Sequence, residues 1–214
     1  MDFLPELLEK YVDEHTSPEP EVLKQLTRET YTKILMPQML SGHVQGQFLK
    51  MLSCMINPEK ILEIGTFTGY SAICLSEGLK KGGLLHTIDI NEELADIVYR
   101  YLKKSGAANK VKTHIGNALE IIPKIDEVFD LVFIDADKKN YTNYFNMVFD
   151  KVRKGGYIIA DNVLWSGKVI HPVEKADSDT HGIMKYNDMV MQDKRVESVL
   201  IPIRDGVLIS RKIV

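Results

Sequence analysis

The chain has 214 residues, of which 44% are hydrophobic and 27% charged, the composition of an ordinary globular protein. This length suits one domain with a substantial buried core, so residues 1–214 are interpreted as a single domain. A net charge of −3 gives no general support for nucleic-acid binding, and no apolar run approaches the ~18 residues of a membrane-spanning helix.

The first part of the chain predicts three helices. Apolar side chains at helical spacing over residues 3–12 indicate an amphipathic helix, which residues 17–20 (SPEP) interrupt. A second helix is expected from Glu21 to about Leu35, and a third over residues 48–56, after a loop at 39–43. We expect residues 1–57 to form a helical cover over a core of residues 58–214. Ordinary packing of these helices against the core is the alternative.

From Lys60 onward, short apolar runs alternate with helical patterns, which is typical of a parallel sheet buried on both faces. Asp205-Gly206 separates the last two runs and indicates a hairpin. We therefore predict an α/β fold in which an antiparallel hairpin ends a parallel sheet. The predicted strands span residues 60–65, 84–90, 111–116, 130–135, 156–161, 196–203 and 207–213.

The stretch from Lys60 to Ser71 predicts the ligand crevice. Its apolar run ends in Glu63 and Gly65, and a helix follows from about Tyr70. A strand, a glycine turn and a helix in this order form a ligand site in open α/β sheets. Phe67 stands where the fingerprint G-x-G-x-x-G has the glycine that makes room for a pyrophosphate. The turn therefore favours a ligand without phosphate at this place, such as S-adenosylmethionine, over a dinucleotide.

Two later strand ends fit a nucleoside. Asp89 ends the second strand, where a carboxylate can accept hydrogen bonds from both ribose hydroxyls. The alternative is an acid at a helix N-terminus, although Asn91 already supplies a cap there. Residues 116–118 end the third strand, where small residues can border an adenine ring.

Oxygen-bearing side chains end two further strands. Asp135 follows the fourth strand, and Asp161 and Asn162 end the fifth. If these strands are neighbours, two carboxylates and an amide converge on one edge of the sheet, a donor set that suits a hard divalent cation. Magnesium is the first candidate, with manganese and calcium as alternatives. Each aspartate taken singly is also an ordinary turn former.

Lys138 and Trp165 complete the predicted site. Lys138 comes three residues after Asp135, and a neighbouring cation would favour its neutral amine, which can act as a base. The alternative is a solvated surface lysine. Trp165 either walls an aromatic substrate or anchors its own loop.

These residues together resemble the cation-dependent O-methyltransferases related to catechol and caffeoyl-coenzyme A O-methyltransferases. The resemblance runs from about Met39 to the C-terminus and rests on residues 45–49, 62–71, 133–138, 161–167, 193–196 and 205–206. It implies a Rossmann-like sheet of seven strands and S-adenosylmethionine as the methyl donor. It also implies a homodimer.

The resemblance further implies a role for each matching residue. The cofactor would be held by Ser41, Glu63, Gly65, Ser71, Asp89, Ala118 and Asp135. The metal ligands would be Asp135, Asp161 and Asn162, with Lys138 as the base and Asp135 beside it, and with Trp165 and Met39 at the substrate. Ser166 and Lys185 stand where relatives have asparagine and arginine, so the substrate is left open.

The sequence thus predicts metal-dependent methylation of a hydroxyl on a vicinal dihydroxy-aromatic small molecule. Methylation of a hydroxylated uridine in transfer RNA is the alternative within this chemistry, and the charge balance argues against it. A non-catalytic S-adenosylmethionine-binding protein and a nicotinamide oxidoreductase are the alternatives from other classes.

The N-terminus shows no signal-peptide pattern and the two cysteines form no C-x-x-C motif, so we expect a cytoplasmic protein.

Overall fold

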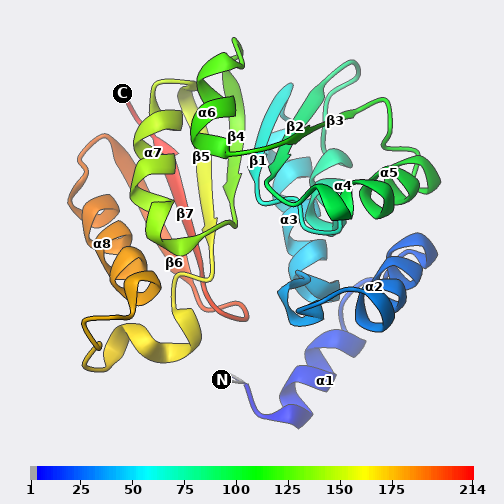
Figure 1. The fold of residues 1–214 in the computed structure, drawn as a ribbon, viewed down its shortest axis with the longest axis horizontal. Coiled ribbons are helices and arrows are strands. Elements are labelled where there is room, and N and C mark those ends of the chain that lie inside the picture. Colours follow the sequence, from blue (N-terminus) through cyan, green and yellow to red (C-terminus); the bar gives the residue numbers. More distant parts are fainter. Residues whose placement is uncertain (1–3) are drawn as a thin grey trace.

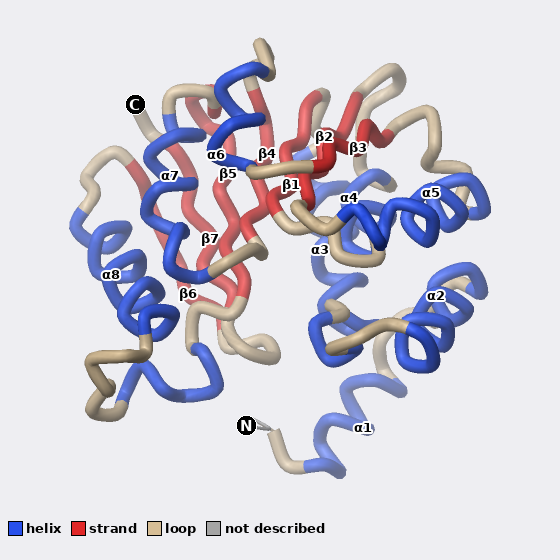
Figure 2. Tube along the Cα trace, viewed as in Figure 1, coloured by secondary structure: helices blue, strands red, loops and turns tan. Residues whose placement is uncertain are grey.

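The computed structural model describes residues 4–214 and has a seven-stranded sheet between layers of helices (Figures 1 and 2). The strands are β1 (Lys60–Ile64), β2 (Leu84–Asp89), β3 (Val111–Ile115), β4 (Phe129–Ile134), β5 (Val152–Asp161), β6 (Val196–Ile201) and β7 (Val207–Lys212). The main helices are α1 (Glu6–Glu14), α2 (Glu21–Lys33), α3 (Gly42–Ile56), α4 (Tyr70–Ser76), α5 (Ala95–Lys104), α6 (Ala118–Ile121), α7 (Tyr141–Phe149) and α8 (Ser178–Gln192). Short 3-10 helices lie at η1 (Pro37–Met39), η2 (Glu92–Leu94), η3 (Ile122–Lys124), η4 (Lys138–Asn140) and η5 (Trp165–Ile170).

The strand order is β3-β2-β1-β4-β5-β7-β6. Strands β1 to β5 pair in parallel, whereas β7 runs antiparallel to both β5 and β6. The predicted α/β class and the closing antiparallel hairpin are therefore confirmed. The chain reverses its direction of progress across the sheet between β1 and β4, which is the place where open α/β sheets bind ligands.

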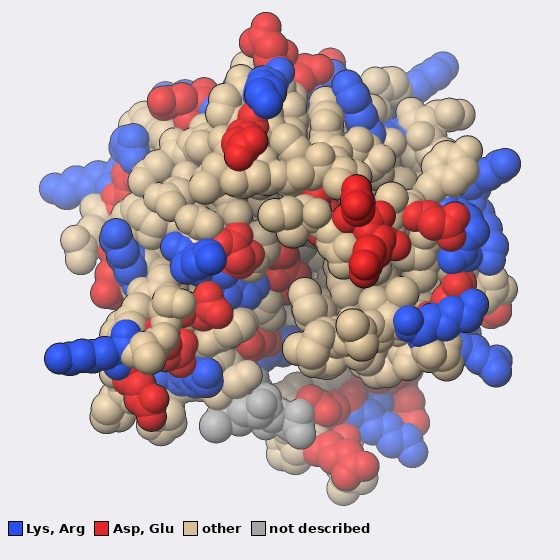
Figure 3. All heavy atoms as spheres, viewed as in Figure 1, with Lys and Arg blue, Asp and Glu red and all other residues tan. Residues whose placement is uncertain are grey.

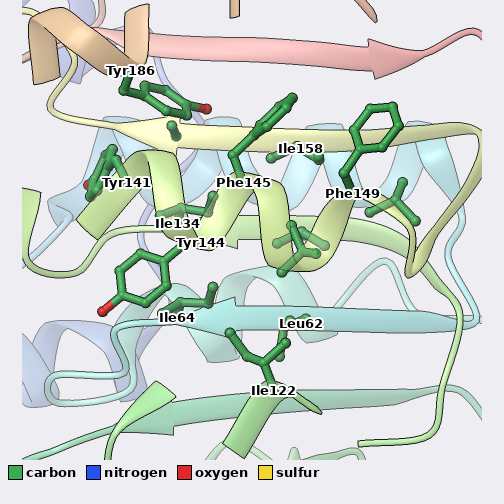
Figure 4. Close-up of a cluster of buried hydrophobic side chains, with 14 of the residues drawn as sticks. Leu62, Ile64, Ile122, Ile134, Tyr141, Tyr144, Phe145, Phe149, Ile158 and Tyr186 are labelled. Carbon is green, nitrogen blue, oxygen red and sulfur yellow. The ribbon is translucent and has the colours of Figure 1, made fainter. Parts of the chain in front are cut away.

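Successive residues of a strand face opposite sides of the sheet, and helices bury the side chains on both sides. Leu62 and Ile64 of β1 pack with α7 and α8 on one face, as Figure 4 shows with Phe145 and Tyr186. Ile61, which precedes Leu62, packs on the other face with helices α2 to α5. The near-continuous apolar runs of the sequence follow from this double coverage.

The N-terminal helices differ in how firmly they pack. Helix α2 buries Leu23, Leu26 and Thr30, and its Glu29 bonds to Arg100 of α5. Helix α1 forms over the predicted region, but the side chain of Leu7 is 83% exposed and no residue of α1 is buried. The apolar periodicity correctly predicted that this segment is helical, but it did not show which surface, if any, covers its apolar side. Phe3, the first residue of the predicted pattern, lies outside the described residues.

Three predicted boundaries shift. Strand β5 begins at Val152 rather than at residue 156, helix α2 ends at Lys33 rather than at about Leu35, and helix α3 begins at Gly42, inside the predicted loop at 39–43. The stretch between Asn162 and Asp177, predicted to be irregular, contains η5, where Trp165 and Ser166 have positive φ. Among residues 4–214, none of the helices combines the length and the apolar character needed to span a bilayer.

Candidate functional site

A cavity of about 2110 Å³ lies over the carboxyl ends of the central strands and beneath the N-terminal helices. Figure 3 shows the surface hollowed near its centre, with acidic and basic side chains around the hollow. The cavity is lined by most of the predicted site residues, namely Met39, Ser41, Gly65, Ser71, Asp89, Ala118, Asp135, Lys138, Asp161, Asn162 and Trp165. The topology therefore brings together residues that are far apart in the sequence.

The glycine turn after β1 is shaped by the end of β4. Gly65 has a φ of +104°, and a Cβ atom at this position would lie 1.8 Å from the carbonyl oxygen of Asp135. Only glycine fits such an approach. The turn is tied to β2 as well, because the backbone N–H groups of Thr66 and Phe67 donate to Asp89 Oδ2 at 3.0 and 2.7 Å. Asp89 thus fixes the turn while it also lines the cavity.

Glu63 lies beneath the turn rather than in the cavity wall. Its side chain is fully buried, and Thr87 donates a hydrogen bond of 2.5 Å to its Oε2 atom. Burial raises the pKa of Glu63 to about 8, against the opposing effect of hydrogen bonds from Ser71 and Thr87.

The two predicted metal-binding carboxylates lie on neighbouring strands. Ile134 of β4 is in register with Ala160 of β5, so Asp135 and Asp161 follow at the same edge of the sheet. The side chain of Asp161 is only 2% exposed. Burial raises its pKa well above the ordinary value, and the negative charge of Asp135 contributes in the same direction. The site thus concentrates negative charge that a cation would relieve.

Lys138 is buried between these oxygens and is not a surface residue. Its Nζ atom donates to Asp135 Oδ1 at 2.9 Å, to Asn162 Oδ1 at 2.7 Å and to the hydroxyl of Tyr141 at 2.6 Å. An ammonium group has three protons, so all of its donors are used. Tyr141 connects Lys138 with the end of β5, because its hydroxyl also donates to the carbonyl oxygen of Asp161 at 3.0 Å.

The arrangement fits a hard divalent cation. Oxygens of Asp135 and Asn162 already surround one positive charge, the Lys138 ammonium, and Asp161 adds a second carboxylate nearby. Within residues 4–214 no three His, Cys, Asp or Glu side chains form a metal-binding group, so the predicted set depends on the amide of Asn162. Carboxylate and amide oxygens are ligands that Mg²⁺, Mn²⁺ and Ca²⁺ accept.

The two candidate substrate residues differ in exposure. Met39 is 57% exposed on η1, whereas Trp165 packs in part against the core cluster below α8. The centroid of the Trp165 ring lies 5.7 Å from Lys138 Nζ. Trp165 therefore both anchors its loop and lines the cavity, so that the two alternatives drawn from the sequence are compatible.

A histidine attaches α1 above the cavity. His43 Nδ1 lies 2.7 Å from Asp13 Oδ1, and Nε2 lies 2.7 Å from the carbonyl oxygen of Ser17. Burial alone would lower the pKa of His43, but these two acceptors and Glu19 raise it above the ordinary value. The charged imidazole, which has two donors, satisfies both acceptors at once.

Sequence reasoning gave no role to three residues of the site, Gln45, Tyr141 and Arg204. Gln45 donates to Asp161, and Arg204 contacts Gln45 from the connection between β6 and β7. The motif QGQFL at residues 45–49 had marked Gln45 without indicating what it contacts. Tyr141 comes three residues after Lys138, a spacing that places both on one side of a helical turn.

The sheet order, the glycine turn and the cavity at the strand ends define a Rossmann-like α/β protein of the methyltransferase type. Residues 13–213 match the family model described as O-methyltransferase. The chain belongs to this family, and the prediction of an S-adenosylmethionine-dependent O-methyltransferase is confirmed.

Individual relatives agree with this assignment. A caffeoyl-CoA O-methyltransferase of Petroselinum crispum is 36% identical, over 91% of this chain and 85% of the relative. An O-methyltransferase of Streptomyces achromogenes involved in tomaymycin synthesis, solved in complex with S-adenosylmethionine, superposes with a TM-score of 0.90 at 28% identity, over 97% of this chain and 96% of that one. An O-methyltransferase of Bacillus cereus, solved with S-adenosylhomocysteine, has a TM-score of 0.89 at 30% identity, over 96% and 97% of the two chains.

Proposed function

We propose that this protein transfers a methyl group from S-adenosylmethionine to one hydroxyl of a vicinal dihydroxy-aromatic small molecule, with the help of a divalent cation. The observation that carries the proposal is the cluster of Asp135, Asp161, Asn162 and Lys138 in the same cavity as the glycine turn. Two neighbouring hydroxyl oxygens can chelate one cation, which a single hydroxyl cannot do. Relatives named caffeoyl-CoA O-methyltransferases support an aromatic acceptor.

The cofactor would lie along the ends of β1, β2 and β3. Gly65 and Ser71 of the turn and Ser41 would border its methionine part, with Asp135 close to the amino group. Asp89 would accept from the ribose hydroxyls, and Ala118 would border the adenine. Glu63 would act from below, by supporting Ser71 and the strand end rather than by lining the cavity.

The residues of the chain would then perform the transfer. When bound, a divalent cation would supply positive charge that favours the ionised form of the acceptor hydroxyl. Lys138, as the neutral amine, would take the hydroxyl proton onto Nζ. The acceptor oxygen would attack the methyl carbon, and the carbon–sulfur bond would break with its electron pair left on sulfur, which gives S-adenosylhomocysteine. Asp135, Asp161 and Asn162 would hold the cation, and Trp165 would border the aromatic ring, so that the acceptor oxygen is kept at near-attack distance, ~3 Å from the methyl group.

The test is a panel of catechols, caffeoyl thioesters and transfer RNA, each scored for methyl incorporation with and without EDTA. We expect methylation of aromatic diols that EDTA abolishes and added Mg²⁺ or Mn²⁺ restores. Full activity in EDTA would overturn the role of the cation, and incorporation into transfer RNA alone would overturn the aromatic acceptor. Calorimetry should detect S-adenosylhomocysteine binding under the same conditions.

We also propose that the protein is a homodimer. Exposed apolar side chains on α1 and near the end of α2, such as Leu7 at 83% and Leu35 at 87% exposure, support an association between copies. Light scattering should give about twice the chain mass of 24.3 kDa. A mass near that of one chain at working concentration would contradict the proposal.

A further inference from the structure

A buried glutamine lies behind the predicted metal site. Gln45 of α3 is only 1% exposed, and its Nε2 atom donates to Asp161 Oδ2 at 2.6 Å. Its other amide atom, Oε1, accepts from Nη1 of Arg204 at 3.1 Å. Arg204 belongs to the connection between β6 and β7, so that three separate parts of the chain meet at this one side chain.

The donor and acceptor roles in this chain of contacts allow only one orientation of the Gln45 amide. A guanidinium group has donors and no acceptor, so it is the amide oxygen that faces Arg204. The amide N–H₂ group must then face Asp161. The carboxylate is held at its second oxygen as well, because the backbone N–H of Asn162 donates to Asp161 Oδ1 at 2.8 Å. Both oxygens of Asp161 are therefore fixed in direction.

Arg204 is itself fixed by the backbone in front of α3. Its Nη1 atom also lies 2.9 Å from the carbonyl oxygen of Leu40 and contacts that of Ser41, so its two N–H groups are shared among three acceptors. Leu40, Ser41 and Arg204 all line the cavity. The same contacts thus connect the cavity wall with the orientation of a predicted metal ligand.

We propose that Gln45 is a positioning residue for the cation site, and that Arg204 sets its orientation. Gln45 is too deep to be a ligand beside Asp161, because its N–H₂ group faces the carboxylate and its oxygen is used by Arg204. It holds the Asp161 carboxylate toward Asp135 and Asn162, in the way that outer-shell partners orient metal ligands. This inference rests on the proposed metal-dependent function.

The test measures metal affinity apart from catalysis. Mn²⁺ is titrated by calorimetry into the full-length protein loaded with S-adenosylhomocysteine. Gln45→Met keeps the length of the side chain and removes both hydrogen bonds, and Gln45→Glu replaces the donor by an oxygen. Loss of an outer-shell partner lowers metal affinity by ~10–100-fold, and we expect this range for both variants. Gln47→Met, on the same helix and outside the cavity wall, is the matched control and should bind Mn²⁺ as wild type does.

A second pair of variants tests the orientation. Arg204→Met lets the amide turn either way and should weaken Mn²⁺ binding, whereas Arg204→Lys supplies a donor again and should restore part of the affinity. S-adenosylhomocysteine affinity should stay near wild type in the Gln45 variants, whereas the Arg204 variants are compared with wild type for Mn²⁺ affinity alone, because Arg204 also holds the backbone of Ser41. A KM for metal that rises while kcat at saturating metal recovers would agree with positioning.

The outcomes separate this inference from the proposed function. If wild type binds no Mn²⁺ and stays active in EDTA, the metal-dependent function is wrong and the inference falls with it. If wild type binds Mn²⁺ and Gln45→Met binds it equally well, only the positioning role is wrong. If Gln45→Met lowers S-adenosylhomocysteine affinity and Tm as much as Mn²⁺ affinity, Gln45 is merely structural and the inference is overturned.

Discussion

Replacement of Asp161 by alanine should abolish methyl transfer at ordinary metal concentrations and leave S-adenosylhomocysteine binding close to that of wild type. Asp161 would supply one of two carboxylates in a site that otherwise has the amide of Asn162, so its loss removes charge and geometry together. Loss of a ligand should lower metal affinity by at least the ~10–100-fold that loss of an outer partner causes. The proposed cofactor contacts at Gly65 and Asp89 lie along β1 and β2 and are untouched.

Metal titration of the Asp161→Ala variant checks this expectation. High Mn²⁺ should restore part of the activity if the remaining oxygens still hold the ion. Asp161→Asn should behave less severely, because an oxygen remains while the charge is lost. Asp188→Ala, on the exposed side of α8, is the control for loss of a carboxylate elsewhere. Wild-type activity in Asp161→Ala, or activity that no metal concentration changes, would remove Asp161 from the mechanism.

The sheet and the place of the site could be predicted because they depend on local patterns. Each strand is a short apolar run, and the carboxyl ends of parallel strands meet at one edge of a sheet. For that reason Asp135 and Asp161, although separated by a helix and a strand, were expected together. Asp135 directly follows β4 and Asp161 ends β5, and these two strands are neighbours in the sheet.

The contacts of the site depend on packing that no local pattern encodes. Gln45 of α3 reaches Asp161 at the end of β5. Its neighbour Gly46 packs so closely on α4 that a Cβ atom there would be 2.4 Å from Cε1 of Tyr70. That close approach is a property of the folded pair and not of either helix. Glu63 shows the same limit, since the sequence placed it at a strand end, whereas its depth beneath the turn is set by neighbouring strands.

The sequence also could not predict the backbone conformation that follows the fifth strand. Asn162 has a φ of +57°, which directs its amide oxygen toward Lys138 at 2.7 Å. Positive φ is uncommon for residues other than glycine, although asparagine adopts it more readily than most. The sequence could therefore predict that Asn162 ends the strand, while the direction of its side chain required the structure.

Replacement of Lys138 by methionine should lower the rate constant for methyl transfer while metal affinity stays equal or increases. Loss of a general base typically lowers the rate by ~10²–10⁴-fold. The metal affinity should not fall, because the Lys138 ammonium occupies oxygens of Asp135 and Asn162 that a cation would use. A fall in the rate constant without a fall in metal affinity distinguishes a base from a ligand or from a residue that only supports the fold.

The pH dependence sharpens the test. Without an amine to take the proton, the acceptor hydroxyl must ionise by itself, so part of the lost rate should return between pH 7 and pH 10. Lys103→Met, at an exposed position of α5 outside the cavity wall, should keep the wild-type rate and pH profile. Binding of S-adenosylhomocysteine and of Mn²⁺, measured by calorimetry, shows whether the Lys138→Met variant is folded. A folded variant with the wild-type rate at neutral pH would exclude Lys138 as the base, and a loss of metal affinity equal to that of Asp161→Ala would make it part of the cation site instead.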